Sequence, residues 1–333
     1  MMPYLSKHTG CTLAALFIGC LTTRAAEPAN PIALTVDESK GEAEVTFRGK
    51  RVLLYTFART QHKPYVRELC MPGGGNVLRD APADHLHHHG LMYAIRINGV
   101  NFWEERGAPG HERHVRWLHK ETGTDASGHP VATLVELIHW IPDKDKALED
   151  AAKAALLVET RTLRVSMDEQ AHEVALDWEG AFAVGPAASE VRLHGSEYNG
   201  LGMRLAQPWD HVAVHANSTR KAFPNGGRRD VLPARWTSTT LAGVGMLAFF
   251  GHADNARGDT RFFTTLDPYT YLSATQALNG EPILHRSGDE WRVRYLLTVG
   301  SEKQTPDSLD ARWEQWNQAT AKKSDKETAP PKP

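Results

Sequence analysis

Histidines crowd into one short stretch of the sequence, where they could perform acid–base or metal chemistry. Residues 84–89 read Asp-His-Leu-His-His-His, so His85, His87, His88 and His89 follow Asp84 within six positions. Imidazole accepts and delivers protons near neutral pH, and it is also the commonest metal ligand in proteins. A neighbouring carboxylate such as Asp84 would fix its tautomer. We therefore predict that the functional site is built around this stretch.

The residues leave two kinds of site open. If residues 84–89 are extended, His85, His87 and His89 point to one side of the strand and His88 to the other. Three imidazoles on one side could bind zinc, copper or iron, so a divalent metal ion is a candidate cofactor, and no other cofactor is indicated. Alternatively, the histidines work with a carboxylate in acid–base catalysis, for which Glu197 and Glu104 are candidates besides Asp84.

The histidine stretch lies directly before a predicted β-hairpin. Asn98 and Gly99 are the pair that a two-residue type I′ turn favours, and apolar runs at 91–97 and 100–103 flank them. Gly90 separates the histidines from the first of these runs. We therefore expect residues 84–89 to form a loop or strand mouth at the rim of a sheet, where rigid scaffolds usually present reactive groups.

The rest of the chain predicts an all-β fold. Short segments with apolar residues at every second position recur along the sequence, for example at 43–47, 51–57 and 157–166. A helical insertion is expected at 146–156, and one longer helix follows Thr305, which can cap it. We predict a single domain at 30–320, a large antiparallel β-sandwich of the supersandwich kind with one C-terminal helix.

Both ends of the chain carry signals of a different kind. Lys7 precedes an apolar run at 11–21, which ends in Thr23-Arg24-Ala25, a small-x-small cleavage pattern. Residues 1–25 are thus predicted to be a signal peptide, and the protein is expected to be exported to the periplasm or outside the cell. Lipid anchoring at Cys20 is a weaker alternative. Residues 321–333 lack an apolar face and are predicted to be a disordered tail.

Composition excludes several classes of protein. The chain has 333 residues, of which 41% are hydrophobic and 23% charged, and its formal net charge is −2. This balance indicates neither a nucleic-acid partner nor an anionic membrane surface. After cleavage of a signal peptide Cys70 is the only cysteine, so neither a disulfide framework nor a Cys-rich zinc site is expected. The oligomeric state is left open.

Several stretches resemble the PmoA-like family of bacterial and fungal proteins. They are His62–Cys70, Arg79–Ala94, Asn98–Trp103 and Glu197–Arg204, and the likeness extends over roughly residues 34–300. The family motif, approximately D-H-x-H-H-x-G, is met by residues 84–90, with Leu86 where proline is common and His89 where Arg or Lys is common. Residues 251–255 are similar to the family's second His-Asn loop without its prolines. The resemblance implies a β-rich sandwich like those of carbohydrate-active proteins, and a link to glycoside cleavage.

These stretches and the surrounding residues complete the predicted site. The catalytic candidates are His85, His87, His88, Asp84 and Glu197. The substrate-binding candidates are Lys63, Tyr65, Trp103, Glu104, Tyr198, Asn199, Arg204 and His252. Aromatic side chains among them would supply flat faces for sugar rings.

The predicted function is that of an exported carbohydrate-active enzyme which cleaves a glycosidic linkage, by hydrolysis or elimination, through His/carboxylate chemistry. Two alternatives are kept: a metal-dependent oxidoreductase or hydrolase that uses the same imidazoles, and a glycan-binding domain without chemistry. The plainest reading of Glu197 is an ion pair with Arg192 or Arg204 at a sheet edge. The plainest reading of the histidines is a hydrogen-bonded rim.

Overall fold

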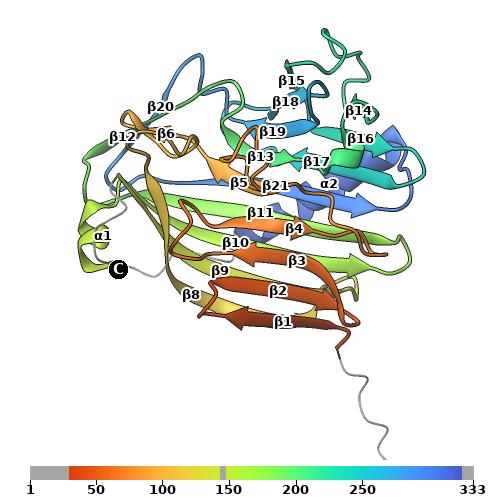
Figure 1. Cartoon of the computed structure of the whole chain (residues 1–333), viewed down its shortest axis with the longest axis horizontal. Coiled ribbons are helices and arrows are strands. Elements are labelled where there is room, and N and C mark those ends of the chain that lie inside the picture. Colours follow the sequence, from red (N-terminus) through yellow and green to blue (C-terminus); the bar gives the residue numbers. More distant parts are fainter. Residues whose placement is uncertain (1–29, 143–147, 325–333) are drawn as a thin grey trace, which may run out of the picture.

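The computed structural model describes residues 30–142 and 148–324. All strand pairings within this part of the chain are antiparallel, and they build three sheets, two of which are large (Figure 1). The predicted all-β sandwich with a C-terminal helix is therefore confirmed. The predicted signal peptide and the last nine residues of the predicted tail lie outside the described residues.

The nine-stranded sheet contains, in spatial order, β1 (Ile32–Asp37), β2 (Glu42–Phe47), β3 (Lys50–Thr56), β4 (Tyr65–Leu69), β5 (Leu91–Ala94), β13 (Gly200–Arg204), β19 (Tyr271–Thr275), β18 (Arg261–Thr265) and β15 (Asp230–Pro233). The eight-stranded sheet contains β14 (Val214–Asn217), β16 (Trp236–Leu241), β17 (Gly245–Gly251), β21 (Glu290–Gly300), β11 (Glu173–Val184), β10 (Leu157–Asp168), β9 (Pro130–Ile141) and β8 (His111–Thr124). The four-stranded sheet contains β20 (Ile283–Arg286), β12 (Glu190–His194), β6 (Arg96–Ile97) and β7 (Val100–Asn101).

Local sequence patterns explain many of these elements. Along β10, buried residues alternate strictly with half-buried ones, which is the period of a strand with one face in the core. Asn98 and Gly99 both have positive φ, at 51° and 85°, and they connect β6 to β7 as predicted. The same backbone conformation at Arg48 and Gly49 connects β2 to β3.

Aromatic side chains fill the space between the two large sheets. The ring of Tyr93 on β5 lies 5.1 Å from that of Trp178 on β11 and 5.9 Å from that of Trp140 on β9. All three side chains are at most 2% exposed. This contact defines the inner face of the nine-stranded sheet, which matters for locating the site on its other face.

The C-terminal helix α2 (Pro306–Ser324) packs against the outer face of β16 and β17 (Figure 1). The Thr305 hydroxyl accepts the Ser308 N–H, as predicted for its cap, and Leu309 and Trp316 bury their side chains against the sheet. The helix includes the first residues of the predicted tail. A short helix α1 (Leu148–Ala154) confirms the predicted insertion, and Gln207–Trp209 form a 3-10 turn. Within residues 30–142 and 148–324, no helix is long and apolar enough to cross a membrane.

A buried ionic network lies between the two large sheets, next to the start of β4. Arg161 on β10 binds Glu159 through two nitrogens, at 2.7 and 2.9 Å, and Glu112 on β8 at 3.1 Å. Its remaining nitrogen donates to the carbonyl of Pro64 at 2.9 Å, directly before β4. Arg161, Glu159 and Glu112 are each at most 2% exposed. The network therefore ties the segment before β4 to the second sheet.

Candidate functional site

The candidate site lies on the outer face of the nine-stranded sheet. Arg204 on β13 stands opposite Tyr271 on β19, so their side chains share one face. Leu201, three positions before Arg204, belongs to the other face and stands opposite Tyr93, whose ring packs on the second sheet. Arg204 and Tyr271 therefore point away from the second sheet, into a region covered by the loops at 79–90, 102–110 and 195–199.

The histidine loop reaches this face through a close contact between backbones. The Arg204 N–H donates to the Gly90 carbonyl at 3.2 Å, which places the end of the loop beside β13. A Cβ atom at Gly90 would lie 2.2 Å from the Val66 carbonyl oxygen of β4. Glycine is therefore required where the loop enters the sheet.

The loop is folded into turns and is not extended. The His85 N–H donates to the Pro82 carbonyl and the His88 N–H to the His85 carbonyl, each at 2.9 Å. As a result the ring of His85 lies 4.5 Å from that of His88 and 5.7 Å from that of His87. The alternation that an extended segment would give therefore does not apply, and the ring of His88 lies beside those of His85 and His87. The three predicted catalytic histidines form one cluster.

Asp84 and His85 form a hydrogen-bonded pair that a buried arginine holds in place. The Nδ1 atom of His85 lies 3.0 Å from the Asp84 carboxylate, which also accepts a bond from Arg204 at 3.2 Å. Burial alone would raise the pKa of Asp84, but the hydrogen bond with His85 and the charge of Arg204 lower it to about 2. Asp84 is thus a carboxylate at any pH at which the protein would work.

Tyr269 joins this pair. Its hydroxyl lies 3.4 Å from Nε2 of His85, on the side of the ring opposite to Asp84. The Arg204 guanidinium stacks on the Tyr269 ring, with 3.5 Å from its carbon to the ring centre. Burial raises the pKa of Tyr269, so its hydroxyl keeps its proton. No motif in the sequence had pointed to Tyr269.

His87 and His88 are kept neutral. Burial lowers the pKa of His88 to about 2, and the nearby His87 and His85 act in the same direction. Burial also lowers the pKa of His87, again helped by His85. His88 is 7% exposed, and its Nδ1 atom has no hydrogen-bond partner in the described part of the chain. Both imidazoles can therefore bind a ligand without carrying a charge.

Aromatic rings continue the site away from the histidines. The ring centre of His88 lies 5.1 Å from that of Tyr271, and Trp103 lies 6.4 Å from Tyr271 and 5.4 Å from Tyr198. A Cβ atom at Gly202 would lie 2.0 Å from the Tyr271 hydroxyl, so only glycine leaves room for that hydroxyl. Trp103 and Tyr198 were predicted as substrate-binding residues, and the structure brings them to the same face as the histidines.

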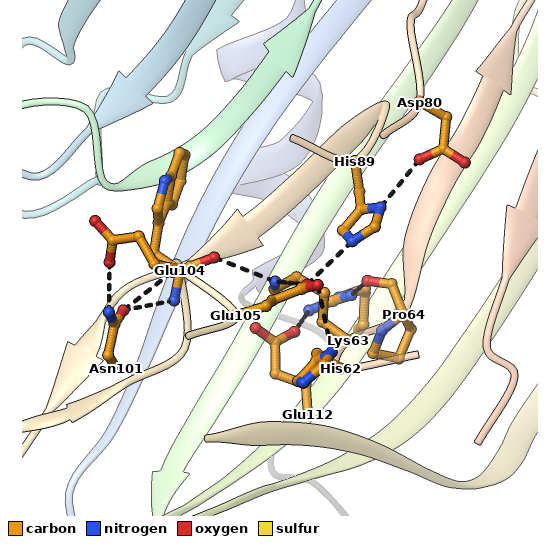
Figure 2. Close-up of polar contacts among 11 residues, drawn as sticks. His62, Lys63, Pro64, Asp80, His89, Asn101, Glu104, Glu105 and Glu112 are labelled. Carbon is orange, nitrogen blue, oxygen red and sulfur yellow. Dashed lines mark hydrogen bonds and ion pairs between the residues drawn. The ribbon is translucent and has the colours of Figure 1, made fainter. Parts of the chain in front are cut away.

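Glu104 lies beside this aromatic group as a fixed carboxylate. It binds Arg96 at 3.1 Å, the Tyr198 hydroxyl at 3.3 Å and the side-chain amide of Asn101 (Figure 2). Burial would raise its pKa, but the hydrogen bond from Asn101 and the charge of Arg96 lower it. Its charge also acts on His87, which places Glu104 within electrostatic reach of the histidine cluster.

His89 belongs to a separate network, which lies next to the cluster. Its Nδ1 atom is 3.0 Å from Asp80 and its Nε2 atom 3.0 Å from Glu105, which also binds Lys63 at 2.6 Å (Figure 2). The ring of Tyr65 stacks on His89 at 4.4 Å. Lys63 and Tyr65, both predicted to bind substrate, therefore serve here to hold the loop, and both are buried.

The structure does not bring His85, His87 and His89, the candidate ligands for a metal ion, into one group, because His89 lies between Asp80 and Glu105. Both ring nitrogens of His89 face carboxylate oxygens, so both donate and neither has a lone pair for a metal. Among residues 30–142 and 148–324, no group of three or more His, Cys, Asp or Glu side chains is arranged to hold a metal ion.

The position of His89 predicts a pH-dependent contribution to stability. Burial alone would lower its pKa, but the hydrogen bonds to Asp80 and Glu105 raise it. A histidine whose pKa is raised by folding stabilises the folded state. This stabilisation is fully present below the pKa of the unfolded state, about 6.5, and it is lost as pH rises through the pKa of the folded state. We expect the free energy of unfolding of the wild type to fall as pH rises above about 6.5 and through the raised pKa of His89. Each pKa unit by which the folded value exceeds the unfolded value adds about 1.4 kcal/mol to the free energy of unfolding.

A His89→Gln variant isolates the pH-dependent stabilisation by His89, because glutamine occupies similar space and does not titrate. Denaturant unfolding at several pH values above 6 should show the difference between wild type and variant shrinking as pH rises. That range lies well above the lowered pKa of Glu105, so its own titration does not interfere. A difference that stays constant with pH would show that His89 is neutral in the fold.

Three further predicted residues lie outside the cluster. Glu197 pairs with Arg229 at 2.5 Å, and not with Arg192 or Arg204, so that expected pairing is wrong. Asn199 accepts the Ser196 N–H at 2.7 Å and stabilises the loop that carries Tyr198. His252 binds the Thr320 hydroxyl of α2 at 2.7 Å, on the outer face of the other large sheet, and it has a structural role there.

Several solved structures of glycoside hydrolases have a similar backbone fold over part of their length. The GH36 α-galactosidase AgaB from Geobacillus stearothermophilus is 10% identical, with a TM-score of 0.48, over 81% of this chain and 41% of that one. The α-galactosidase from Lactobacillus brevis is 9% identical, with a TM-score of 0.42, over 82% and 40%. A Glycoside Hydrolase Family 97 enzyme from a Pseudoalteromonas species is 7% identical, with a TM-score of 0.39, over 81% and 34%. The chain thus spans less than half the length of each of these proteins.

Comparison of sequences gives a family without an assigned activity. No curated protein matches the chain. One family model matches residues 42–314, which include both large sheets except β1, the histidine loop and the first part of α2. The chain therefore belongs to a family of unknown function, DUF6807.

Proposed function

We propose that this protein is a carbohydrate-active enzyme that cleaves a glycosidic linkage, with His85 as its acid–base group and Asp84 as the residue that orients it. The observation that carries the proposal is the bond between Asp84 and Nδ1 of His85, with Asp84 itself anchored by the buried Arg204. A carboxylate at Nδ1 keeps the proton on that nitrogen, which leaves the lone pair of Nε2 free to accept one. The Tyr269 hydroxyl lies next to that nitrogen.

The surroundings of the pair fit a sugar. Trp103, Tyr198 and Tyr271 present aromatic rings on the same face, and pyranose rings pack their apolar faces against such side chains. The indole N–H of Trp103 and the hydroxyl of Tyr271 are buried and have no hydrogen-bond partner within the described residues. Buried polar groups normally have partners, and sugar hydroxyls would provide them.

Electrostatics favour histidine over a pair of carboxyl groups as the acid–base machinery. Glycosidases that use two carboxyl groups need one of them protonated at working pH, which requires a raised pKa. The pKa values of Asp84, Glu104 and Glu105 are all lowered. These three groups are therefore carboxylates at neutral pH, and a neutral imidazole or the Tyr269 hydroxyl is the better proton carrier.

A screen for cleavage tests the proposal. The full chain would be incubated with oligosaccharides of neutral and acidic sugars, and new reducing ends would be measured beside sugar binding by calorimetry. We expect product with the wild type, loss of product with His85→Gln, and unchanged product with His119→Gln, whose side chain is exposed on β8. Binding without product, equal in wild type and His85→Gln, would instead identify a glycan-binding domain and contradict the proposal.

A further inference from the structure

The guanidinium of Arg204 has more hydrogen-bonding capacity than the protein uses. Arg204 is 3% exposed, and its Nη2 donates to Asp84. Nε and Nη1 find no hydrogen-bond partner among the residues that the structure describes. Tyr269 covers one face of the guanidinium plane, but the N–H groups lie at its edge. An unpaired N–H of a buried charged group is costly, so a ligand with acceptor atoms is the expected partner.

Two of the neighbouring unpaired groups can also donate, while the unpaired Nδ1 of the neutral His88 accepts or donates according to its tautomer. The Trp103 indole nitrogen can only donate, and Tyr271, on the same face as Arg204, has an unpaired hydroxyl. By contrast, the carboxylates nearby are already bonded: Asp84 to His85 and Arg204, and Glu104 to Arg96. This face therefore offers donors in excess, and it calls for a ligand rich in acceptors. A carboxylate, with two oxygens and a negative charge, meets that need best.

We infer that the substrate carries a carboxylate, as a uronic acid residue does, that Arg204 binds this carboxylate, and that the linkage is broken by β-elimination. This inference rests on the proposed function and adds the substrate class and the type of cleavage. Elimination needs no water, metal ion or other co-reactant. It needs a group that neutralises the carboxylate, a base and an acid. Arg204, His85 and Tyr269 can supply them, and Tyr269 contacts both of the other two.

The proposed step balances as follows. Nε2 of His85 removes the proton from the ring carbon that bears the carboxylate, and the electrons of that C–H bond form a double bond to the adjacent ring carbon. The glycosidic C–O bond at the adjacent carbon breaks, and its oxygen takes the proton of the Tyr269 hydroxyl. The imidazolium then returns its proton to the Tyr269 oxygen across the 3.4 Å between them. Both side chains end as they began, and the products are a free hydroxyl and an unsaturated uronate.

The negative charge that develops during proton removal explains why Arg204 matters. Removal of that proton delocalises negative charge into the carboxylate, and a guanidinium at the carboxylate stabilises this charge. Arg204 is well suited because Asp84 and Tyr269 fix its position. The raised pKa of Tyr269 keeps its hydroxyl protonated and ready to donate.

Binding measurements test the carboxylate separately from the chemistry. The probes are glucuronic acid, galacturonic acid and their methyl esters, which keep the sugar and remove the charge, with calorimetry on the full chain. We expect the wild type to bind an acid about 10- to 100-fold more tightly than its ester, the range that one charge-assisted hydrogen bond provides. Arg204→Gln should abolish this discrimination. Arg286→Gln, which replaces an exposed arginine of β20 outside the site, should retain it.

Product analysis tests the elimination. Polygalacturonate and alginate would be incubated with the wild type, and the ultraviolet absorbance of the conjugated double bond would be followed together with reducing ends. Both signals rising together, and both lost in Arg204→Gln, would support the inference. Reducing ends without absorbance, or cleavage of neutral glycosides that is unaffected in Arg204→Gln, would overturn it and leave the proposed function standing.

The binding results complete the test. Tighter binding of the acid than of the ester, with no product, would keep carboxylate recognition and overturn both the elimination and the proposed function. Equal binding of acid and ester would overturn recognition by Arg204.

Discussion

An Asp84→Asn variant is expected to lose most of the proposed cleavage activity, with kcat lowered by about 10²- to 10⁴-fold and KM nearly unchanged. The carboxylate of Asp84 accepts from Nδ1 of His85, and so keeps the lone pair on Nε2. An amide at this position can donate to Nδ1 instead, which moves the ring proton to Nε2 and removes the base. Steady-state kinetics on the best substrate of the cleavage screen would measure the effect.

The same substitution should leave the fold intact. The Asp84 side chain is 46% exposed and lies in a loop, and the amide oxygen of asparagine can still accept the bond from Arg204. We expect the thermal transitions of wild type and variant to agree closely. Asp307→Asn is the matched control, because its side chain is almost fully exposed at the start of α2 and pairs with Arg220, far from the histidines. Unchanged kcat in Asp84→Asn would contradict the assigned role of the pair.

The fold was predictable where the determining interactions are local. Strict alternation along β10, the Asn98-Gly99 pair and the Thr305 cap each depend on neighbours within a few positions, and each was found as expected. The order of strands was not predictable, because the nine-stranded sheet places β5 beside β13 and β13 beside β19. These pairings join residues that lie about 70 or more positions apart, and no local pattern specifies them.

In the candidate site, too, residues adjacent in the sequence could be predicted, and residues brought together by strand pairing could not. Asp84, His85, His87 and His88 stood out because unusual residue types were adjacent in the sequence. Tyr269, in the bend before β19, and Tyr271, on β19, stand in a stretch without such a cluster of unusual residue types. Only the pairing of β13 with β19 brings this stretch to Arg204 and the histidine loop. The loop was expected at this position, but its shape was not predictable, because it depends on turn bonds such as that from the Ala81 N–H to the His88 carbonyl. His89 likewise drew attention by adjacency, whereas its partners Asp80 and Glu105 lie up to 16 positions away.

Replacing Arg161 with methionine is expected to lower the free energy of unfolding by about 3–5 kcal/mol, the usual cost of removing one partner from a buried ion network. Burial raises the pKa values of Glu112 and Glu159, and the charge of Arg161 opposes that effect. Without Arg161, two carboxyl groups at most 2% exposed remain beside each other with no cation bonded to them. The Pro64 carbonyl also loses its donor, so the segment before β4 should loosen.

The pH dependence of this loss identifies its cause. A carboxyl group whose folded pKa lies above its unfolded value destabilises the fold increasingly as pH rises between the two values. The cost of Arg161→Met should therefore be larger at pH 8 than at pH 5, as measured by urea unfolding followed by tryptophan fluorescence. Glu112→Gln is the matched control: it keeps Arg161 paired with Glu159 and removes one negative charge, so its effect should be small and in the opposite sense with pH. A cost of Arg161→Met that is equal at both pH values would mean that lost packing of the long side chain, and not the unpaired carboxylates, destabilises the variant.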